Sequence, residues 1–229
     1  MKSFLVSLVF VFSGVGLIAQ DNSGNWSSAD KYLEDQFYVG LGFNFLLEKP
    51  NNVVQRNLSY NLQTGFIKDI PLNKRRNFGL GLGLGYAANS YYSNIEARES
   101  GNEITYEISN DPELDRSKFE THTVEFPFEL RWRTSTVDEY KFWRVYAGAK
   151  LGYVFSGRSK LVNAEDTIGF SNKDIQKWQY GLTISFGYNT WNLQAYYSLN
   201  PLLEDGVSLE NGESINIRPL RIGVIFYIL

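Results

Sequence analysis

Residues 78–86 read FGLGLGLGY and alternate a large apolar residue with glycine at every second position. Because side chains on an extended strand point to opposite faces in turn, this stretch predicts a β-strand with one apolar and one bare face. A soluble sheet normally buries its apolar face and carries polar side chains on the other. The pattern is instead typical of a strand whose apolar face contacts lipid and whose glycines leave room in a crowded barrel lumen. The predicted glycine wall of that lumen consists of Gly79, Gly81, Gly83 and Gly85.

The composition of the 229-residue chain fits a single domain and excludes several classes of protein. The chain has no Cys, one His and a net charge of -3. Without Cys there is no disulfide framework, thiolate metal site or Cys nucleophile. The basic residues Lys74, Arg75 and Arg76 form one short run in a predicted turn, so we expect no nucleic-acid partner. The mean hydropathy is slightly negative, but a barrel that alternates outward apolar and inward polar residues averages to such a value.

The N-terminus predicts export. Lys2 precedes an apolar run over residues 4–18, and the small residue Ala19 follows, so residues 1–19 are predicted to be a secretory signal peptide. An anchoring helix is the alternative, but the run is shorter than the roughly 20 residues that span a bilayer. Residues 20–35 are polar and are predicted to form a periplasmic lead before a barrel domain over residues 36–229. An exported chain of alternating strands is either a soluble β-sandwich or an outer-membrane barrel.

The alternation continues through the mature chain and predicts eight strands. Their approximate ranges are 36–47, 58–67, 78–92, 121–133, 143–155, 178–188, 191–198 and a last strand after residue 214. Long connections alternate strictly with short turns, which a sandwich has no reason to do. The fold class is therefore predicted to be all-β, an eight-stranded antiparallel up-and-down transmembrane barrel of the outer-membrane type. The long loops are expected to face outward, and both termini the periplasm.

Outward-facing aromatic residues give a second test of this fold, because membrane barrels carry aromatic belts at both lipid–water interfaces. The outward residues between the two groups are mostly Leu, Val, Ile and Ala. The predicted belt beside the short turns and chain ends contains Phe37, Phe66, Phe78, Trp132, Trp143, Tyr188, Trp191 and Phe226. The predicted belt beside the long loops contains Phe45, Tyr60, Tyr86, Phe155, Trp178 and Tyr197.

Two strands carry a signature that resembles a known family. Residues 124–133 read VEFPFELRWR and residues 145–157 read VYAGAKLGYVFSG, and the opening DQFYVGLGFNFLL covers residues 35–47. These stretches resemble the PorT-like outer-membrane barrel family common in Bacteroidetes. The resemblance extends over essentially the whole mature region. It implies an integral outer-membrane barrel and, as one role within that group, an accessory of type IX protein secretion or of gliding machinery. No functional residue carries over from the family.

Charged residues share the inward face of the predicted strands. An eight-stranded barrel has an interior that side chains fill, and a buried charge is costly unless it is paired. We therefore expect a salt-bridge network that plugs the lumen, and the alternative is a proton or anion path. The predicted network consists of Glu125, Glu129, Arg131, Arg133, Arg144, Lys150 and Arg221. Pro127 removes one ladder hydrogen bond, which predicts a local bulge or bend.

His122 is the only residue that could act as a general base near neutral pH without a large pKa shift. Outer-membrane enzymes that modify lipid A use a His together with a Ser and an acid, and His122 lies near Ser117, Thr121 and Thr123 in the sequence. No fixed spacing supports a catalytic triad, however. An interfacial His is the simpler interpretation. Acidic residues in the long loops could bind divalent cations or contact lipopolysaccharide bridged by them, but no EF-hand spacing is present and solvated loops are the simpler interpretation. These acids are Asp111, Glu113, Asp115, Glu165 and Asp166.

The sequence thus predicts a non-enzymatic barrel with no catalytic residue, cofactor or metal site. The expected partners are outer-membrane lipid and lipopolysaccharide, and subunits of secretion or gliding machinery. A lipid A-modifying enzyme that uses His122, a small-solute pore and a surface receptor remain as alternatives.

Overall fold

The computed structural model describes eight ranges of the chain: residues 36–55, 57–73, 75–101, 103–109, 114–134, 143–163, 167–188 and 190–228, without the side chains of 114–116 and 163. The signal peptide predicted over residues 1–19 and the lead predicted over 20–35 lie outside these ranges. The chain divides into the units Met1–Tyr32 and Leu33–Leu229, and the second unit contains every described residue. None of the described residues belongs to a helix with the length and apolarity to cross a bilayer.

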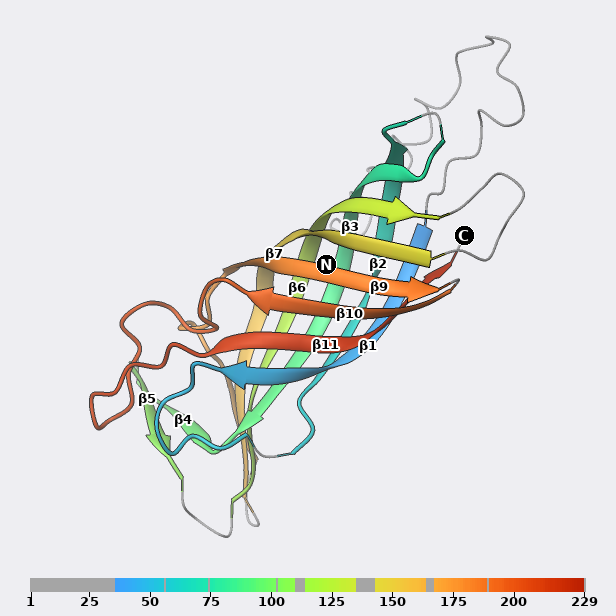
Figure 1. Ribbon diagram of the computed structural model, residues 1–229. Coiled ribbons are helices and arrows are strands. Elements are labelled where there is room, and N and C mark those ends of the chain that lie inside the picture. Colours follow the sequence, from blue (N-terminus) through green and yellow to red (C-terminus); the bar gives the residue numbers. More distant parts are fainter. Residues whose placement is uncertain are drawn as a thin grey trace, which may run out of the picture. The chain divides into compact units, whose positions relative to one another are not determined.

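Eight antiparallel strands close into a barrel (Figure 1). In the order of their pairing they are β1 (Gln36–Leu47), β2 (Tyr60–Pro71), β3 (Phe78–Ser93), β6 (Leu114–Arg133), β7 (Trp143–Asn163), β9 (Trp178–Tyr188), β10 (Trp191–Ser198) and β11 (Arg218–Ile228). Pairing of β1 with β11, from Phe37↔Ile228 onward, closes the ring. Every strand thus has two hydrogen-bonded neighbours, and the predicted eight-stranded antiparallel barrel is confirmed.

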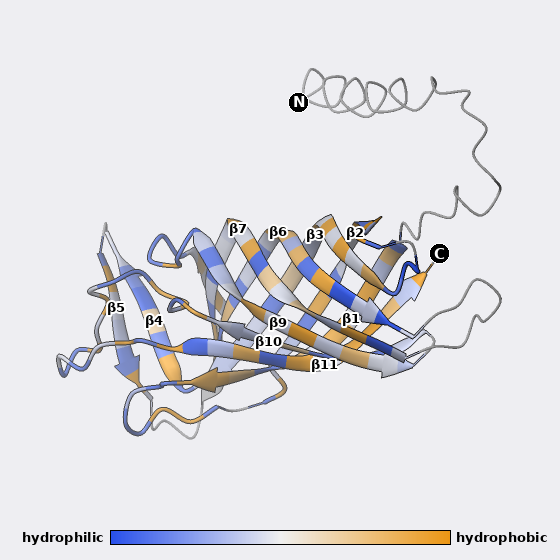
Figure 2. Cartoon of the chain, turned by 45° about the horizontal axis from the view of Figure 1, so that its top comes forward, coloured by the Kyte–Doolittle hydropathy of each residue, from blue (hydrophilic) through white to orange (hydrophobic). Residues whose placement is uncertain are grey.

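The two faces of the barrel wall differ sharply in polarity. Figure 2 shows hydrophobic and hydrophilic residues alternating along the strands. Along β1 and β9, buried and exposed residues alternate without interruption. The exposed positions hold large apolar side chains, and Phe37 and Trp191 are 63% and 66% exposed. An outer surface of this kind is stable in lipid and not in water.

The connections define two ends of the barrel. We call the end with the short connections 72–77, 134–142 and 189–190 the turn end, and the other the long-loop end. The largest differences from the predicted boundaries are that β2 extends to Pro71 instead of Ile67, β6 begins at Leu114 instead of Thr121, and β7 continues to Asn163 instead of Phe155.

The expectation of long polar loops is wrong in two places. The connection after β3 contains a hairpin of β4 (Ile95–Ser100) and β5 (Glu103–Ile108). The connection after β7 contains β8 (Thr167–Ser171), which pairs with residues 158–162 of β7. Figure 1 shows β4 and β5 beyond one end of the barrel strands. These strands are only five or six residues long, and β4 and β5 carry many charges, so their periodicity was too weak to separate from a loop.

An apolar core fills the long-loop end. We call this region the cap: it comprises β4, β5, β8, segments 48–59, 172–177 and 199–217, and the adjoining ends of β1, β3, β6 and β7. Its buried side chains are Leu46, Val53, Tyr91, Ile95, Ala97, Tyr106, Phe119, Val154, Ile175, Leu202, Leu203, Leu209, Ile215 and Ile217. Leu46, Tyr91, Phe119 and Val154 are inward-facing strand residues, so the core of the cap begins inside the mouth of the barrel.

The register does not shift at Pro127. Pro127 pairs with Lys150 in an unbroken stretch of the β6–β7 ladder, and the register of that ladder shifts instead between His122 and Thr123. On the other side, the β3–β6 ladder is interrupted around Pro127, between Leu82↔Phe128 and Gly85↔Glu125, without a change of register. A methyl group on Gly83 would lie only 2.9 Å from Cγ of Pro127. The bare glycine of β3 therefore makes room for the proline ring, and no extra residue is needed there.

Candidate functional site

The first cluster of lumen charges surrounds Glu125 on β6. Its carboxylate accepts hydrogen bonds from Nζ of Lys150 on β7 at 2.9 Å and from Nη1 of Arg221 on β11 at 2.7 Å. Nζ of Lys150 also donates to Gln63 on β2 at 2.6 Å. The guanidinium of Arg221 lies 3.8 Å from the centre of the Tyr196 ring, a cation–π contact. This long-loop-side cluster of Glu125, Lys150 and Arg221 is buried and spans the lumen between three strands.

The second cluster lies nearer the turn end and is organised by Asp69 on β2. Asp69 forms ion pairs with Arg133 and, at 3.9 Å, with Arg131. Nε of Arg131 binds Glu129 at 3.1 Å, and its Nη1 donates to Gln36 at 3.3 Å. We call Asp69, Glu129, Arg131 and Arg133 the turn-side cluster.

Two aromatic rings pack against Arg131. Its guanidinium carbon lies 4.6 Å from the ring centre of Tyr146 and 5.4 Å from that of Tyr227. Arg144 pairs across the ladder with Arg133, and its guanidinium carbon lies 6.0 Å from the Tyr227 ring centre. The structure thus places all seven predicted charged residues inside the lumen, and six of them belong to the two clusters.

The glycine wall lies against the largest lumen side chains. A methyl group on Gly81 would lie 2.6 Å from Nε of Arg131, and one on Gly79 would lie 2.9 Å from Oδ1 of Asp69. A methyl group on Gly85 would overlap the hydroxyl of Tyr38. Each of these three glycines therefore leaves the volume that a facing polar side chain occupies.

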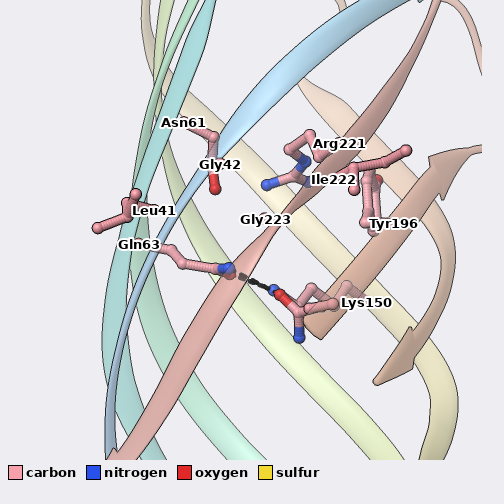
Figure 3. Close-up of a pocket in the computed structure, with 10 residues that line it drawn as sticks. Leu41, Gly42, Asn61, Gln63, Lys150, Tyr196, Arg221, Ile222 and Gly223 are labelled. Atoms are coloured by element: carbon pink, nitrogen blue, oxygen red, sulfur yellow. Dashed lines mark hydrogen bonds between the residues drawn. The ribbon is translucent and has the colours of Figure 1, made fainter. Parts of the chain in front are cut away.

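Little space remains among these side chains. A cavity beside the long-loop-side cluster has a volume of about 10 Å³ and is lined by Gln63, Lys150, Gln194, Tyr196 and Arg221, among others. Figure 3 shows residues from β1, β2, β7, β10 and β11 around it. That volume is about what one water molecule needs, so this cavity holds no larger solute.

Sequence reasoning missed Asp69. Residues 66–70 read FIKDI, and ending the strand at Ile67 left the carboxylate outside it. The structure continues β2, with Lys68 exposed and Asp69 buried. The predicted set contained five basic and only two acidic inward residues, and this imbalance was the signal that a further acid had to face the lumen.

His122 lies on the outer face of the barrel, away from the hydroxyl groups that were considered as its partners. Its Nδ1 is 2.6 Å from the hydroxyl of Tyr86, and its ring also contacts that of Phe155. Thr121 and Thr123 are buried on the opposite face of β6. The structure therefore groups His122 with aromatic side chains.

The remaining predicted site residues are the belt aromatics and the loop acids. Of the predicted aromatic belts, only Phe66, Tyr197 and Phe226 are partly covered, and the other side chains are exposed. Asp111, Glu113, Glu165 and Asp166, and the side chain of Asp115, lie outside the described residues. Within the part of the chain that the structure describes, no group of three or more His, Cys, Asp or Glu could hold a metal ion.

Comparison with known proteins places the chain in a family. The crystal structure of Ail, the attachment invasion locus protein of Yersinia pestis, is 12% identical over 85% of this chain and 97% of that one, with a TM-score of 0.36. Ail in complex with the heparin analogue sucrose octasulfate is 12% identical with the same coverage and a TM-score of 0.34. A triple mutant of Rhodopseudomonas blastica porin is 8% identical over 86% of this chain and all of that one, with a TM-score of 0.21. No curated protein matches the chain. The family model for the outer membrane protein beta-barrel domain matches residues 18–204, so the chain belongs to this family and is an outer-membrane β-barrel protein.

Proposed function

We propose that this protein is a non-enzymatic barrel that serves as a structural or accessory component of envelope machinery, with type IX protein secretion or gliding as the process. The observation that carries the proposal is a lumen crossed by ion pairs beneath an apolar cap. Glu125 alone joins β6 to β7 and β11 through Lys150 and Arg221. A barrel filled in this way is suited to hold its loops in place. The resemblance to PorT-like barrels supports the choice of process.

The same features argue against a small-solute pore. A solute would have to separate buried ion pairs, and breaking a buried pair costs about 3–5 kcal/mol. The cap core would block the long-loop end as well. Reconstituted in planar bilayers, the protein is expected to show no steady conductance. Regular conductance steps would support the pore instead.

An enzyme that modifies lipid A is disfavoured by the surroundings of His122. Its described partners are the hydroxyl of Tyr86 and the rings of Tyr86 and Phe155, which supply neither the Ser nor the orienting acid of a triad. The substitution His122→Ala is therefore expected to leave the lipid A acylation profile of cells unchanged. A changed profile with an intact barrel would favour the enzyme.

We further propose that the long-loop end faces outward and that both chain termini lie in the periplasm. The alternation of long connections with turns, and the position of the start of β1 and the end of β11 at the turn end, support this orientation. An epitope inserted after Gly101, where the β4–β5 turn is open, should bind antibody on intact cells. Binding only after the outer membrane is permeabilised would reverse the orientation.

Partner association tests the central proposal. A tag placed in the lead near Ser23 allows pull-down from native membranes in mild detergent. Larger envelope subunits are expected to co-purify, and the same tag on an unrelated small barrel controls for adhesion. Recovery of the bare monomer from every such preparation would contradict an accessory role.

A further inference from the structure

Basic side chains gather on the outer face of the wall where it rises above the long-loop aromatic belt. On β6, Glu120 and Lys118 lie on the same outer face as His122, farther toward the long-loop end. On β7, the register shift beside His122 turns Arg158 and Lys160 to that outer face, while Ser159 and Leu161 are buried. We call Lys118, Arg158 and Lys160 the basic cluster.

The charge of this cluster is incompletely balanced. Lys118 forms an ion pair with Glu120, and its Nζ lies 5.3 Å from the ring centre of Tyr92. Among the described residues, neither Arg158 nor Lys160 has a carboxylate within 4.0 Å. Across the β6–β7 ladder Lys118 is the direct partner of Lys160, and Glu120 is the direct partner of Arg158, so one acid faces three basic residues. Like charges opposite one another destabilise a sheet, so a bound anion would stabilise this arrangement.

The cluster continues the lipid-facing surface. His122, Tyr86 and Phe155 pack together in the long-loop belt, at the level where the apolar outer face ends. Arg158 lies two strand residues beyond Ser156, the ladder partner of His122, and Lys160 lies four beyond it. At about 3.4 Å per residue these steps are about 7 and 14 Å along the strand, and a tilt of about 40° reduces them to about 5 and 10 Å along the membrane normal. The headgroup layer of one leaflet is about 5–8 Å thick, so the backbone of Arg158 lies within it and that of Lys160 lies near its outer edge.

We propose that the basic cluster binds the phosphate groups of a diphosphorylated glycolipid headgroup of the lipid A type in the outer leaflet. Arg158 offers a planar fork of donors to phosphate oxygens, and Lys118 and Lys160 add positive charge. The acyl chains of that lipid would then lie against outward residues of β6 and β7 below the belt, such as Phe126 and Tyr153. The assignment rests on the proposed orientation of the long-loop end.

The test uses the purified barrel in non-ionic detergent and native mass spectrometry. The protein is titrated with diphosphorylated lipid A, with its fully dephosphorylated form, and with phosphatidylglycerol. The double variant Arg158→Gln and Lys160→Gln is compared with Lys68→Gln, an outward basic residue at the opposite end of the barrel. Heat-dependent gel mobility checks that each variant is folded.

Diphosphorylated lipid A should bind about 30-fold more weakly to the double variant, because each basic residue near a charged surface contributes about 1 kcal/mol. Lys68→Gln should change the affinity less than about twofold. Wild-type protein should bind the dephosphorylated lipid and phosphatidylglycerol at least about tenfold more weakly, a result that needs no variant to fold. Equal binding of the phosphorylated and dephosphorylated forms, an equal effect of Lys68→Gln, or equally tight phosphatidylglycerol would overturn the proposal.

Two further results separate this site from the proposed function. Absence of co-purifying subunits would contradict the accessory role but would not affect the proposal of lipid binding. Antibody access to the Gly101 epitope only after permeabilisation would reverse the orientation, and with it the assignment to an outer-leaflet lipid. The phosphate dependence in detergent would be unaffected by either result.

Discussion

The barrel and the cap share the long strands β6 and β7 but enclose interiors of opposite polarity. Along the turn-end half of β6, inward positions hold Glu125, Glu129 and Arg131, whereas Phe119 is buried farther along the same face. β7 changes in the same way, from Lys150 to Val154 and Leu161. On the outer face of β6 the change is the reverse, from apolar Phe126 in the barrel wall to charged Lys118 beside the cap. The point of change lies beside the long-loop aromatic belt.

The comparison shows that the surroundings decide which face of a strand is polar. In the barrel wall, lipid covers the outside, so polar residues are placed inside and must satisfy one another. In the cap, water covers the outside and apolar residues form an ordinary buried core. Each region therefore depends on a different interaction, ion pairing in one and apolar burial in the other, and substitutions can separate them.

The largest effect is expected from Glu125→Gln. This change leaves Lys150 and Arg221 buried without their shared carboxylate, and losing one partner of a buried ion pair costs about 3–5 kcal/mol. The free energy of unfolding would be measured by urea titration in detergent, with gel mobility as the signal. Glu120→Gln on the same strand is the matched control, because its pair with Lys118 is partly exposed and worth less than about 1 kcal/mol. Equal losses for the two variants would mean that the lumen screens charge as well as the surface does.

The barrel could be predicted from the sequence because each of its strands carries its own signal. Lipid outside and a crowded interior force a period of two on every spanning strand. β9 and β10 match their predicted ranges, and β1 does so as well. The charges on the inward face of β6 and β7 were predicted for the same reason, since parity alone places them.

The cap could not be predicted in this way because its order comes from contacts distant in sequence. Ile95, Tyr106 and Ile215 come from three separate segments, and none is recognisable as core until the segments meet. Asp69 was missed because Pro71 lies two residues after it, and a proline usually marks the end of a strand. Pro71 instead occupies the last position of β2, opposite Gly79.

A smaller effect, confined to the cap, is expected from Ile95→Ala. Ile95 is fully buried in the cap core, and removing a buried Ile side chain in this way costs about 3 kcal/mol. Hydrogen exchange of the β4–β5 amides should accelerate about 100-fold, while exchange in β9 and β10 stays unchanged. Ile168→Ala is the control, because that side chain is 48% exposed on β8. If β9 and β10 also exchange faster, the cap and the barrel unfold as one unit and the two interiors are not independent.

The smallest effect concerns a buried hydroxyl network within the cap. The hydroxyl of Tyr106 accepts a hydrogen bond from Nδ2 of Asn172 at 2.9 Å and donates one to Asp174 at 3.0 Å. Tyr106→Phe removes both and is expected to cost the cap about 1 kcal/mol. Limited proteolysis of the cap at pH 8 measures this cost, with Tyr153→Phe on the lipid-facing surface as the control.

The same residue gives the cap a dependence on high pH. Burial raises the pKa of Tyr106, and the carboxylate of Asp174 raises it further. An unfolded tyrosine ionises near pH 10, so the stability from the protonated hydroxyl is fully present below about pH 10 and is lost as the pH rises toward the folded pKa. Wild-type cap should therefore become more sensitive to subtilisin between about pH 10 and 11, by up to about tenfold per pH unit, and Tyr106→Phe should show a shallower rise. Parallel curves for the two proteins would show that Tyr106 ionises as readily in the folded cap as in the unfolded chain, and that the interior of the cap is wetter than its apolar side chains imply.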